Sequence, residues 1–224
     1  MKKLAVFCVC LFTTFALFSQ SVRSINANFE VDKQGWTSGN SVGVVEWSDL
    51  FPPMAHRSGI SFSGENKDGS LFLFIQKEVT DLLPNTNYHV KFNMNWVCRM
   101  EVSAPPIFVK VGATNQEPEI IDAICLLTEE LRFFTSFDKG EIGQNSRDFT
   151  VAGQLTPDKY GRPFLQNVNN FDNAFSVNTD DEGRLFLMIG LEPKSGDIEH
   201  IYLNTLRILL AENGEARESP TNNN

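Results

Sequence analysis

The stretch Tyr88-His-Val-Lys-Phe-Asn-Met-Asn-Trp96 decides the fold. Its apolar residues occupy every second position with polar residues between them, which is the pattern of a β-strand that has one face on a core and the other in solvent. The residues just before it, Leu83-Pro84-Asn85-Thr86-Asn87, favour a turn, because Pro and Asn adopt the backbone angles that a turn requires. We therefore predict a strand over residues 88–96 that is entered through a tight turn.

Two other stretches, residues 71–75 and 185–189, are apolar at every position, and each follows a turn that contains glycine. Strands of this kind belong in the middle of a sheet that is covered on both faces. Further short strands are predicted at residues 42–47, 59–63, 107–112, 131–137, 148–153, 174–178 and 200–210. About ten short strands separated by Gly, Pro and Asn predict an all-β protein, a β-sandwich.

Two segments depart from the strand pattern. Ile120, Ile124, Leu127 and Leu131 recur at helical spacing after Pro118-Glu119, which suit a first helical turn. We predict one short helix at residues 118–128. Residues 141–173 are rich in Gly, Asn and Gln and are predicted to form long loops.

The N-terminus has the layout of a secretory signal peptide. Met1-Lys2-Lys3 is a positive head, residues 4–18 are an apolar run, and Ser19-Gln20-Ser21 is small and polar. We predict a signal peptide at residues 1–20, a single domain at 25–211 and a disordered tail at 212–224. The protein is then secreted, periplasmic or on the cell surface, with no membrane span after cleavage; an uncleaved anchor is the alternative.

The charge excludes one class of partner. The formal net charge is −9, and Lys and Arg form no cluster along the sequence, so we expect no nucleic-acid binding. The chain has 19 Phe beside 3 Trp and 3 Tyr. Because most Phe fall in predicted strands, they indicate a dry core rather than an exposed stacking surface.

Two cysteines, Cys98 and Cys125, remain after removal of the predicted signal peptide. In an oxidising compartment they can form one disulfide bond. Two buried free thiols are the other interpretation, and the sequence leaves both open.

The motifs of several enzyme classes are missing. His56, His89 and His200 lie far apart, and the sequence has no nucleophile elbow, phosphate loop or dinucleotide fingerprint. Acidic residues are plentiful, and the densest cluster is Asp180-Asp181-Glu182; Asp138 and Asp148 flank a Gly-containing loop. Two carboxylates suffice for a glycoside hydrolase, so this activity stays open. Solvated acids in turns are the simpler interpretation, and we favour a protein without catalytic activity.

Several short motifs resemble those of carbohydrate-binding modules with a galactose-binding-like jelly roll. They are Asn28-Phe29-Glu30 with Gly35-Trp36, the stretch from Val79 to Tyr88, and residues 202–206. The resemblance implies a jelly-roll β-sandwich and a structural calcium ion beside the first and last strands. Glu30 matches the position of one carboxylate ligand, and the backbone near Gly69 could supply carbonyl ligands. Asn204 stands where many modules have Asp, which removes one negative charge, although an Asn oxygen can still ligate calcium.

Residues 137–140, 148–153 and 179–190 also resemble a group of secreted bacterial proteins without an assigned activity. This second resemblance implies export and a β-sandwich, and it implies no reaction.

Sugar binding requires aromatic faces that stack on pyranose rings while their polar edges stay wet. Trp36 and Trp96 are expected in the core, which leaves Trp47 and Tyr160 as the candidate carbohydrate-binding residues. We therefore expect an exported, non-catalytic β-sandwich that binds a glycan or another cell-surface polymer. A structural or adhesive envelope protein that binds a cell-surface protein is the first alternative. A carboxylate-based glycoside hydrolase or lyase is the second.

Overall fold

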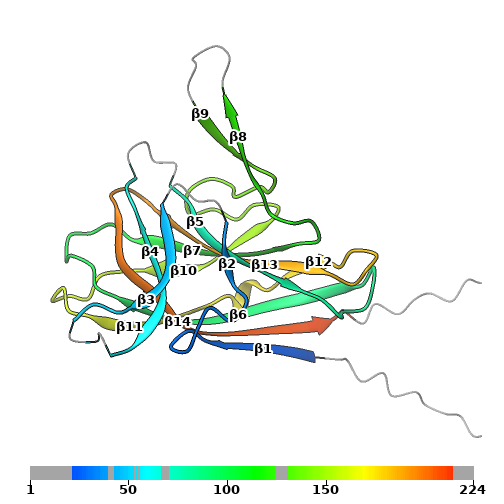
Figure 1. The fold of residues 1–224 in the computed structure, drawn as a ribbon, viewed down its shortest axis with the longest axis horizontal. Coiled ribbons are helices and arrows are strands. Elements are labelled where there is room, and N and C mark those ends of the chain that lie inside the picture. The colour runs from blue at the N-terminus through cyan, green and yellow to red at the C-terminus, as the bar shows by residue number, and fades with distance from the viewer. Residues whose placement is uncertain are drawn as a thin grey trace, which may run out of the picture.

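The computed structural model describes residues 22–39, 43–52, 54, 56–66, 71–124 and 131–213, and its regular structure is almost entirely β-strand (Figure 1). Sheet A contains β1 (Val22–Asn28), β3 (Val44–Asp49), β4 (Ser58–Gly64), β6 (Asn87–Cys98), β11 (Phe164–Asn169), β12 (Phe175–Asn178) and β14 (Ile198–Glu212). Sheet B contains β2 (Thr37–Ser38), β5 (Leu73–Val79), β7 (Ile107–Thr114), β10 (Phe149–Leu155) and β13 (Leu185–Pro193). A hairpin of β8 (Ile120–Ile124) and β9 (Leu131–Thr135) and the 3₁₀ helix η1 (Phe171–Asn173) complete the described elements.

Both sheets are antiparallel. Sheet A has the order β11-β6-β14-β4-β3, with β1 also paired to β14 and β12 to β6, and sheet B has the order β10-β7-β13-β5-β2. From β4 to β7 the chain alternates between the sheets, and it alternates again from β12 to β14. This wrapping is the connectivity of a jelly-roll sandwich, so the predicted fold class is confirmed.

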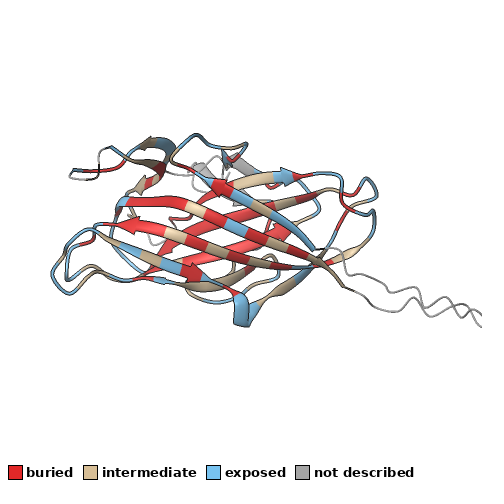
Figure 2. Ribbon diagram, turned by 90° about the horizontal axis from the view of Figure 1, so that it is seen from below, coloured by how far each residue is buried: buried red, intermediate tan, exposed pale blue. Residues whose placement is uncertain are grey.

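The core lies between the two sheets. Along β6 the side chains alternate as the sequence predicts, and the buried set is Tyr88, Val90, Phe92, Met94 and Trp96. Figure 2 shows the same alternation of buried and less buried positions along the strands of the sandwich. The apolar stretch 71–75 leads into β5 and the apolar stretch 185–189 opens β13, and these two strands are neighbours in sheet B, as expected for central strands.

A second apolar cluster, the Phe cluster, lies on the outward face of sheet B. It consists of Phe72, Phe74, Phe137, Phe149 and Met188. Gly190 on β13 makes room for it, since a Cβ atom there would lie 2.2 Å from the Phe72 ring. Part of the Phe content therefore forms a buried layer outside the sandwich core, which the sequence did not predict.

The predicted helix at residues 118–128 is wrong for the described part of that segment. Residues 120–124 form β8, which pairs with β9 in the register Ile120 to Thr135 through Ile124 to Leu131. The segment is rich in Ile, whose branched Cβ favours extended backbone, and cross-strand pairing overrides the helical spacing. The hairpin stands away from the two sheets in Figure 1. Residues 125–130 lie outside the described residues.

The prediction of long loops at residues 141–173 is also wrong in part. This stretch contains β11, which pairs with β6 from Phe164 to Asn169. β11 lies at the edge of sheet A and buries only Val168, so its apolar alternation is too weak to read from the sequence.

The predicted signal peptide and most of the predicted tail lie outside the described residues. β1 begins at Val22 and β14 ends at Glu212, slightly beyond the predicted domain limits. Within the described part of the chain, no helix has the length and apolarity needed to cross a membrane.

Candidate functional site

Two adjacent rows of polar side chains cross the outward face of sheet A. The first row follows the register Asn28, Thr205, Asn95 and Asn167, from β1 through β14 and β6 to β11. The second row is Asn26, Arg207, Asn93 and Asn169. Residues opposite one another in a sheet have Cβ atoms about 4.5–5.5 Å apart, so each row is a continuous line of hydrogen-bonding groups.

The rows border a groove of about 390 Å³, which we call the amide groove. Its lining residues are Asn26, Ala27, Asn28, Gln34, Asn93, Asn95, Thr205, Leu206 and Arg207. The many Asn residues in the lining are not explained by a preference for β-strand, because Asn is disfavoured in strands. The inward residues between these positions, such as Ala27, Met94 and Leu206, are buried and hold the strands in place.

The amides are bound to one another and retain free hydrogen-bonding capacity. Asn95 Nδ2 donates to Thr205 Oγ1 at 2.8 Å, and Asn167 Nδ2 donates to the Oδ1 atoms of Asn93 and Asn95 at 2.6 and 2.9 Å. Each amide offers two donors and an oxygen with two lone pairs. The amide nitrogen of Asn93 donates to no group among the described residues, so the groove can offer it to a ligand.

One wall of the groove is set by the connection from β1 to β2. Gln34 adopts a positive φ of 47°, and its Nε2 donates to the carbonyl of Asn28 at 2.9 Å. Its backbone N–H donates to Asp32 Oδ1 at 2.8 Å. These bonds hold the Gln34 side chain beside the strands.

This site was not predicted from the sequence, although a signal was present. Asn-x-Asn occurs at Asn26-Ala-Asn28, Asn93-Met-Asn95 and Asn167-Val-Asn169, each time within a strand. Because side chains two apart in a strand share a face, each motif places two amides on one side of its strand. The sequence alone does not show that the three motifs lie in register.

The two predicted sugar-binding aromatics do not line the amide groove. Trp47 is 39% exposed at the β3 edge, and its Nε1 donates to the carbonyl of Phe29 at 2.6 Å, so its polar edge is used within the protein. Tyr160 is 62% exposed in the loop before β11. Its ring packs against Lys159 and Arg162, whose charged groups lie 4.7 and 4.9 Å from the ring centroid. Among the described residues, no ring contact joins Trp47 to Tyr160.

The predicted calcium ligands Glu30 and Asn204 do lie together, but with a third residue between them. Glu30 Oε1 accepts hydrogen bonds from Arg57 Nε and from Asn204 Nδ2, the latter at 3.2 Å. Asn204 Oδ1 accepts one from Arg57 Nη2 at 3.1 Å. The bonds from Arg57, then from Asn204, lower the pKa of the Glu30 carboxyl. Gly69 lies outside the described residues.

These residues do not fit a calcium ion. Calcium takes six to eight oxygen ligands, whereas here both predicted side chains are bound to a guanidinium and Asn204 directs its amide nitrogen at Glu30. Among the described residues no group of three or more His, Cys, Asp or Glu side chains could hold a metal ion. The positive charge beside the first and last strands comes from Arg57, which was not predicted from the sequence.

We therefore expect chelation to leave stability unchanged. The melting temperature should be the same in EDTA and in millimolar calcium. Arg57→Met should lower the free energy of unfolding by about 1 kcal/mol, since the pair is about one-third exposed and screened by solvent. A higher melting temperature in calcium would contradict this arrangement.

The same pair gives a pH dependence. The folded-state pKa of Glu30 is lowered, so its contribution is present above the carboxyl pKa of the unfolded chain and is lost as pH falls through the lowered value. The stability difference between the native chain and Arg57→Met should therefore shrink in acid. Urea unfolding of the native chain and of Arg57→Met at pH 7 and at pH 3 measures this stability difference. An equal difference at both pH values would contradict the assignment of the lowered pKa to the Glu30–Arg57 pair.

The acidic clusters serve as turn caps. Asp180 Oδ1 accepts the backbone N–H groups of Glu182 and Arg184 at 3.0 and 2.7 Å, and its Oδ2 accepts a bond from Arg184 Nε at 2.7 Å. The backbone bond from Arg184 is the main cause that lowers the pKa of Asp180. A general acid needs a raised pKa, so Asp180 gives no support to the hydrolase alternative.

Asp138 and Asp148 have similar roles. Asp148 Oδ2 accepts the backbone N–H of Asp138 at 2.7 Å, and Asp138 Oδ1 accepts that of Gly140 at 2.9 Å. Arg147 pairs with Asp148 at 2.8 Å. Both carboxylates are thus engaged in holding their own loop.

Cys98 is a fully buried free cysteine, and burial raises the pKa of its thiol to about 12. A thiol in this state is protonated and unreactive at neutral pH. Cys125 lies outside the described residues, so the disulfide stays a prediction.

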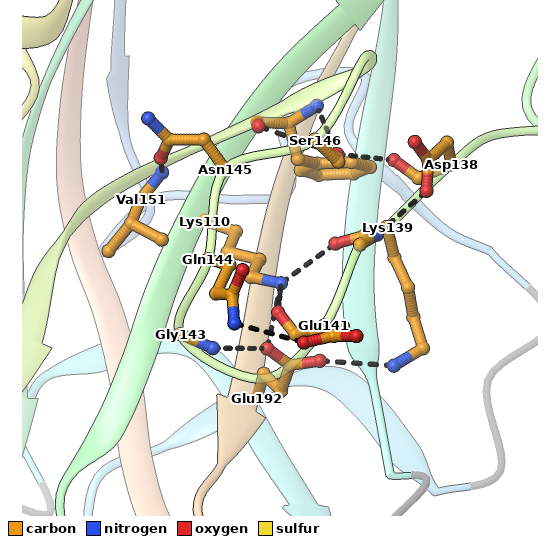
Figure 3. Close-up of polar contacts among 12 residues, drawn as sticks. Lys110, Asp138, Lys139, Glu141, Gly143, Gln144, Asn145, Ser146, Val151 and Glu192 are labelled. Atoms are coloured by element: carbon orange, nitrogen blue, oxygen red, sulfur yellow. Dashed lines mark hydrogen bonds and ion pairs between the residues drawn. The ribbon is translucent and has the colours of Figure 1, made fainter.

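A second polar cluster lies on the outward face of sheet B, where Glu192 pairs with Lys110 and Lys139 in a largely buried charged network (Figure 3). Glu192 Oε2 lies 2.8 Å from Lys110 Nζ and accepts the backbone N–H of Gly143 at 3.1 Å. Its Oε1 lies 3.0 Å from Lys139 Nζ. Lys110 also donates to the carbonyls of Lys139 and Glu141 at 2.7 and 2.8 Å. Every charge has partners and two are inaccessible, so this network, the Lys–Glu clamp, fastens the 137–148 segment rather than offering a site.

Similarity to known proteins is confined to structure, since no family model and no curated protein matches the sequence. The chain is similar to the N-terminal modules of the Clostridium thermocellum xylanase 10B, solved with xylohexaose, with a TM-score of 0.40 and 13% identity over 87% of this chain and 29% of that one. It is also similar to a carbohydrate-binding module that recognises mannan (TM-score 0.36, 9% identity, 84% of this chain and 98% of that one). A third similar structure is the K3 cleaved adhesin domain of Lys-gingipain from Porphyromonas gingivalis W83, with a TM-score of 0.34 and 13% identity over 84% of this chain and 99% of that one. Carbohydrate-binding modules are thus among the similar folds, as the sequence motifs imply.

Proposed function

We propose that the protein is a non-catalytic glycan-binding β-sandwich, exported by the predicted signal peptide, and that its ligand lies in the amide groove. The observation that carries the proposal is the pair of rows of polar side chains across β1, β14, β6 and β11. Sugar hydroxyls both donate and accept hydrogen bonds. A surface of Asn, Gln and Thr side chains offers both kinds of partner at each position.

The length of the two rows agrees with an extended ligand. The rows run across four strands, three of which line the groove, and four strands span about 14 Å at the usual strand spacing. The floor is rigid, because each polar position alternates with a buried apolar one. Prior ordering of the binding groups lowers the entropy cost of holding a flexible polymer.

A glycan-binding screen of the full chain tests the proposal. We expect Asn93→Ala/Asn95→Ala to weaken binding of the retained glycan roughly tenfold or more, because two hydrogen-bonding side chains of about 1 kcal/mol each are removed. Asn115→Ala is the matched control, since Asn115 is exposed in the turn after β7 and lies outside the groove. Melting temperatures of both variants verify that the fold is intact.

Two outcomes would overturn the proposal. The first is that no glycan binds. The second is that Tyr160→Ala abolishes binding while Asn93→Ala/Asn95→Ala leaves it unchanged, which would move the site to the loop before β11.

A further inference from the structure

The charge of the amide groove differs from that of the rest of the protein. The chain has 28 Asp and Glu against 19 Lys and Arg. Among the described residues, Arg207 is the one charged residue that lines the groove, and no Asp or Glu lines it. On the outward positions of β1, β6, β11 and the C-terminal half of β14 there is likewise no acidic residue.

Arg207 differs from the other arginines whose side chains the structure describes. Arg57, Arg147 and Arg184 are paired with carboxylates. Arg23, Arg99 and Arg162 contact a carbonyl or an aromatic ring. Arg207 is exposed, lies opposite Asn26 and Asn93, and has no hydrogen bond or ion pair within the described part of the chain.

A second cation lies beside it. Lys91 is two residues from Asn93 on the same face of β6, and it lies opposite Leu209. Lys91 and Arg207 are therefore diagonal neighbours, which lie about 7–8 Å apart in a sheet, within reach of long side chains. Lys91 has no ion pair or side-chain hydrogen bond among the described residues either. Acids on the adjoining segments are Asp32, which caps the Gln34 N–H, Glu30, which is bound to Arg57, Asp172 in η1 and Glu212 at the end of β14.

We propose that the ligand of the amide groove is an anionic glycan, bound by Arg207 and Lys91 through its acidic groups and by the amides through its hydroxyls. This inference rests on the proposed function. An acidic protein repels an acidic polymer over most of its surface, so an unpaired guanidinium at an acid-free site directs such a polymer to that site. Guanidinium binds carboxylate and sulfate alike, in a two-point geometry.

Affinity electrophoresis of the full chain tests the inference with three gels. They contain polygalacturonate as the carboxylated glycan, dextran sulfate as the sulfated one, and xylan as the neutral one. We expect retardation by at least one acidic glycan and weaker or no retardation by xylan. The retention should fall as salt is added, because the charges are exposed.

Arg207→Gln should lower the affinity for the acidic glycan at least tenfold, and Lys91→Gln should lower it by a smaller factor. Arg162→Gln is the matched control: it removes the same charge from the Tyr160 loop and should retain the native affinity. Melting temperatures of all three should stay near that of the native chain.

The outcomes separate this inference from the proposed function. Binding of xylan alone, weakened by Asn93→Ala/Asn95→Ala, overturns the charge preference and keeps the groove. Equal losses in Arg207→Gln and Arg162→Gln overturn the role of Arg207, since they would reflect net charge only. Binding of none of the three glycans, or of any other in the screen, overturns both proposals.

Discussion

Glu192→Gln is expected to lower the free energy of unfolding by about 3–5 kcal/mol, because it leaves the buried ammonium group of Lys110 without a counter-charge. The side chain of Lys110 is 0% exposed and that of Glu192 is 1% exposed. Water therefore cannot replace the lost partner. The carbonyls of Lys139 and Glu141 still accept bonds from Lys110, but they carry no net charge.

The double variant Lys110→Met/Glu192→Met should recover most of the stability that Glu192→Gln loses, since removing both partners of a buried pair avoids the isolated charge. The two substitutions should be strongly non-additive in a double-mutant cycle. Glu141→Gln is the matched control in the same segment, because Glu141 is exposed and, within the described part of the chain, its carboxylate accepts a bond from Gln144 alone.

Urea unfolding followed by tryptophan fluorescence measures these differences, with Trp36 and Trp96 buried in the core as reporters. In thermal melts the single variant should unfold roughly 6–20 °C below the native chain, at about 2–4 °C per kcal/mol for a domain of this size. A loss under 1 kcal/mol for Glu192→Gln, or a double variant as unstable as the sum of the singles, would show that the clamp contributes little.

The Lys–Glu clamp also shows what the sequence can and cannot predict. Lys110 lies inside a strand that was predicted at residues 107–112, and Glu192 follows the one predicted at 185–189. Strand prediction worked there because short runs of apolar residues, several of them β-branched, are a local signal for a buried strand. The clamp itself requires that β7 and β13 be neighbours, with Lys110 opposite Gly190. That register is a long-range property, and no local pattern encodes it.

The same limit applies to the candidate site. Trp47 and Tyr160 were chosen by residue type, and neither lines the amide groove. The groove joins residues of β1, β6 and β14, whose outward amides were visible as Asn-x-Asn motifs but whose alignment was not. The resemblance did place Glu30 and Asn204 together, because both follow from the position of the first and last strands. It did not predict Arg57, which reaches them from a different segment.

The sequence predicted a turn correctly at the end of the sandwich where β6 begins. The Leu83-to-Asn87 turn is present, and the N–H of Leu83 donates to the hydroxyl of Tyr88 at 3.1 Å. Its partner is the turn before β13: Thr179 Oγ1 donates to the carbonyl of Leu83 at 2.7 Å and accepts the N–H of Thr86 at 2.9 Å. The two turns are therefore one interlocked unit, although they are far apart in the sequence.

Gly183→Ala should break this unit and lower the free energy of unfolding by about 3 kcal/mol or more. Gly183 has a φ of +76°, which an alanine adopts only with strain, and a Cβ atom there would lie 2.1 Å from the carbonyl oxygen of Leu82. That oxygen belongs to the backbone, so relief requires the turns to separate. Separation would weaken the bond from Leu82 N–H to the Gly183 carbonyl, which is 3.1 Å long.

Gly196→Ala separates the two causes. Gly196 has nearly the same φ, +74°, but the nearest heavy atom to an added Cβ is Pro105 Cγ at 3.9 Å, which is ordinary contact. This variant should therefore lose only the strain of the left-handed backbone, about 1 kcal/mol. Urea unfolding of both variants measures the difference. Equal losses would mean that the two turns move apart at no cost, and the interlock would then contribute nothing beyond the conformation of its glycine.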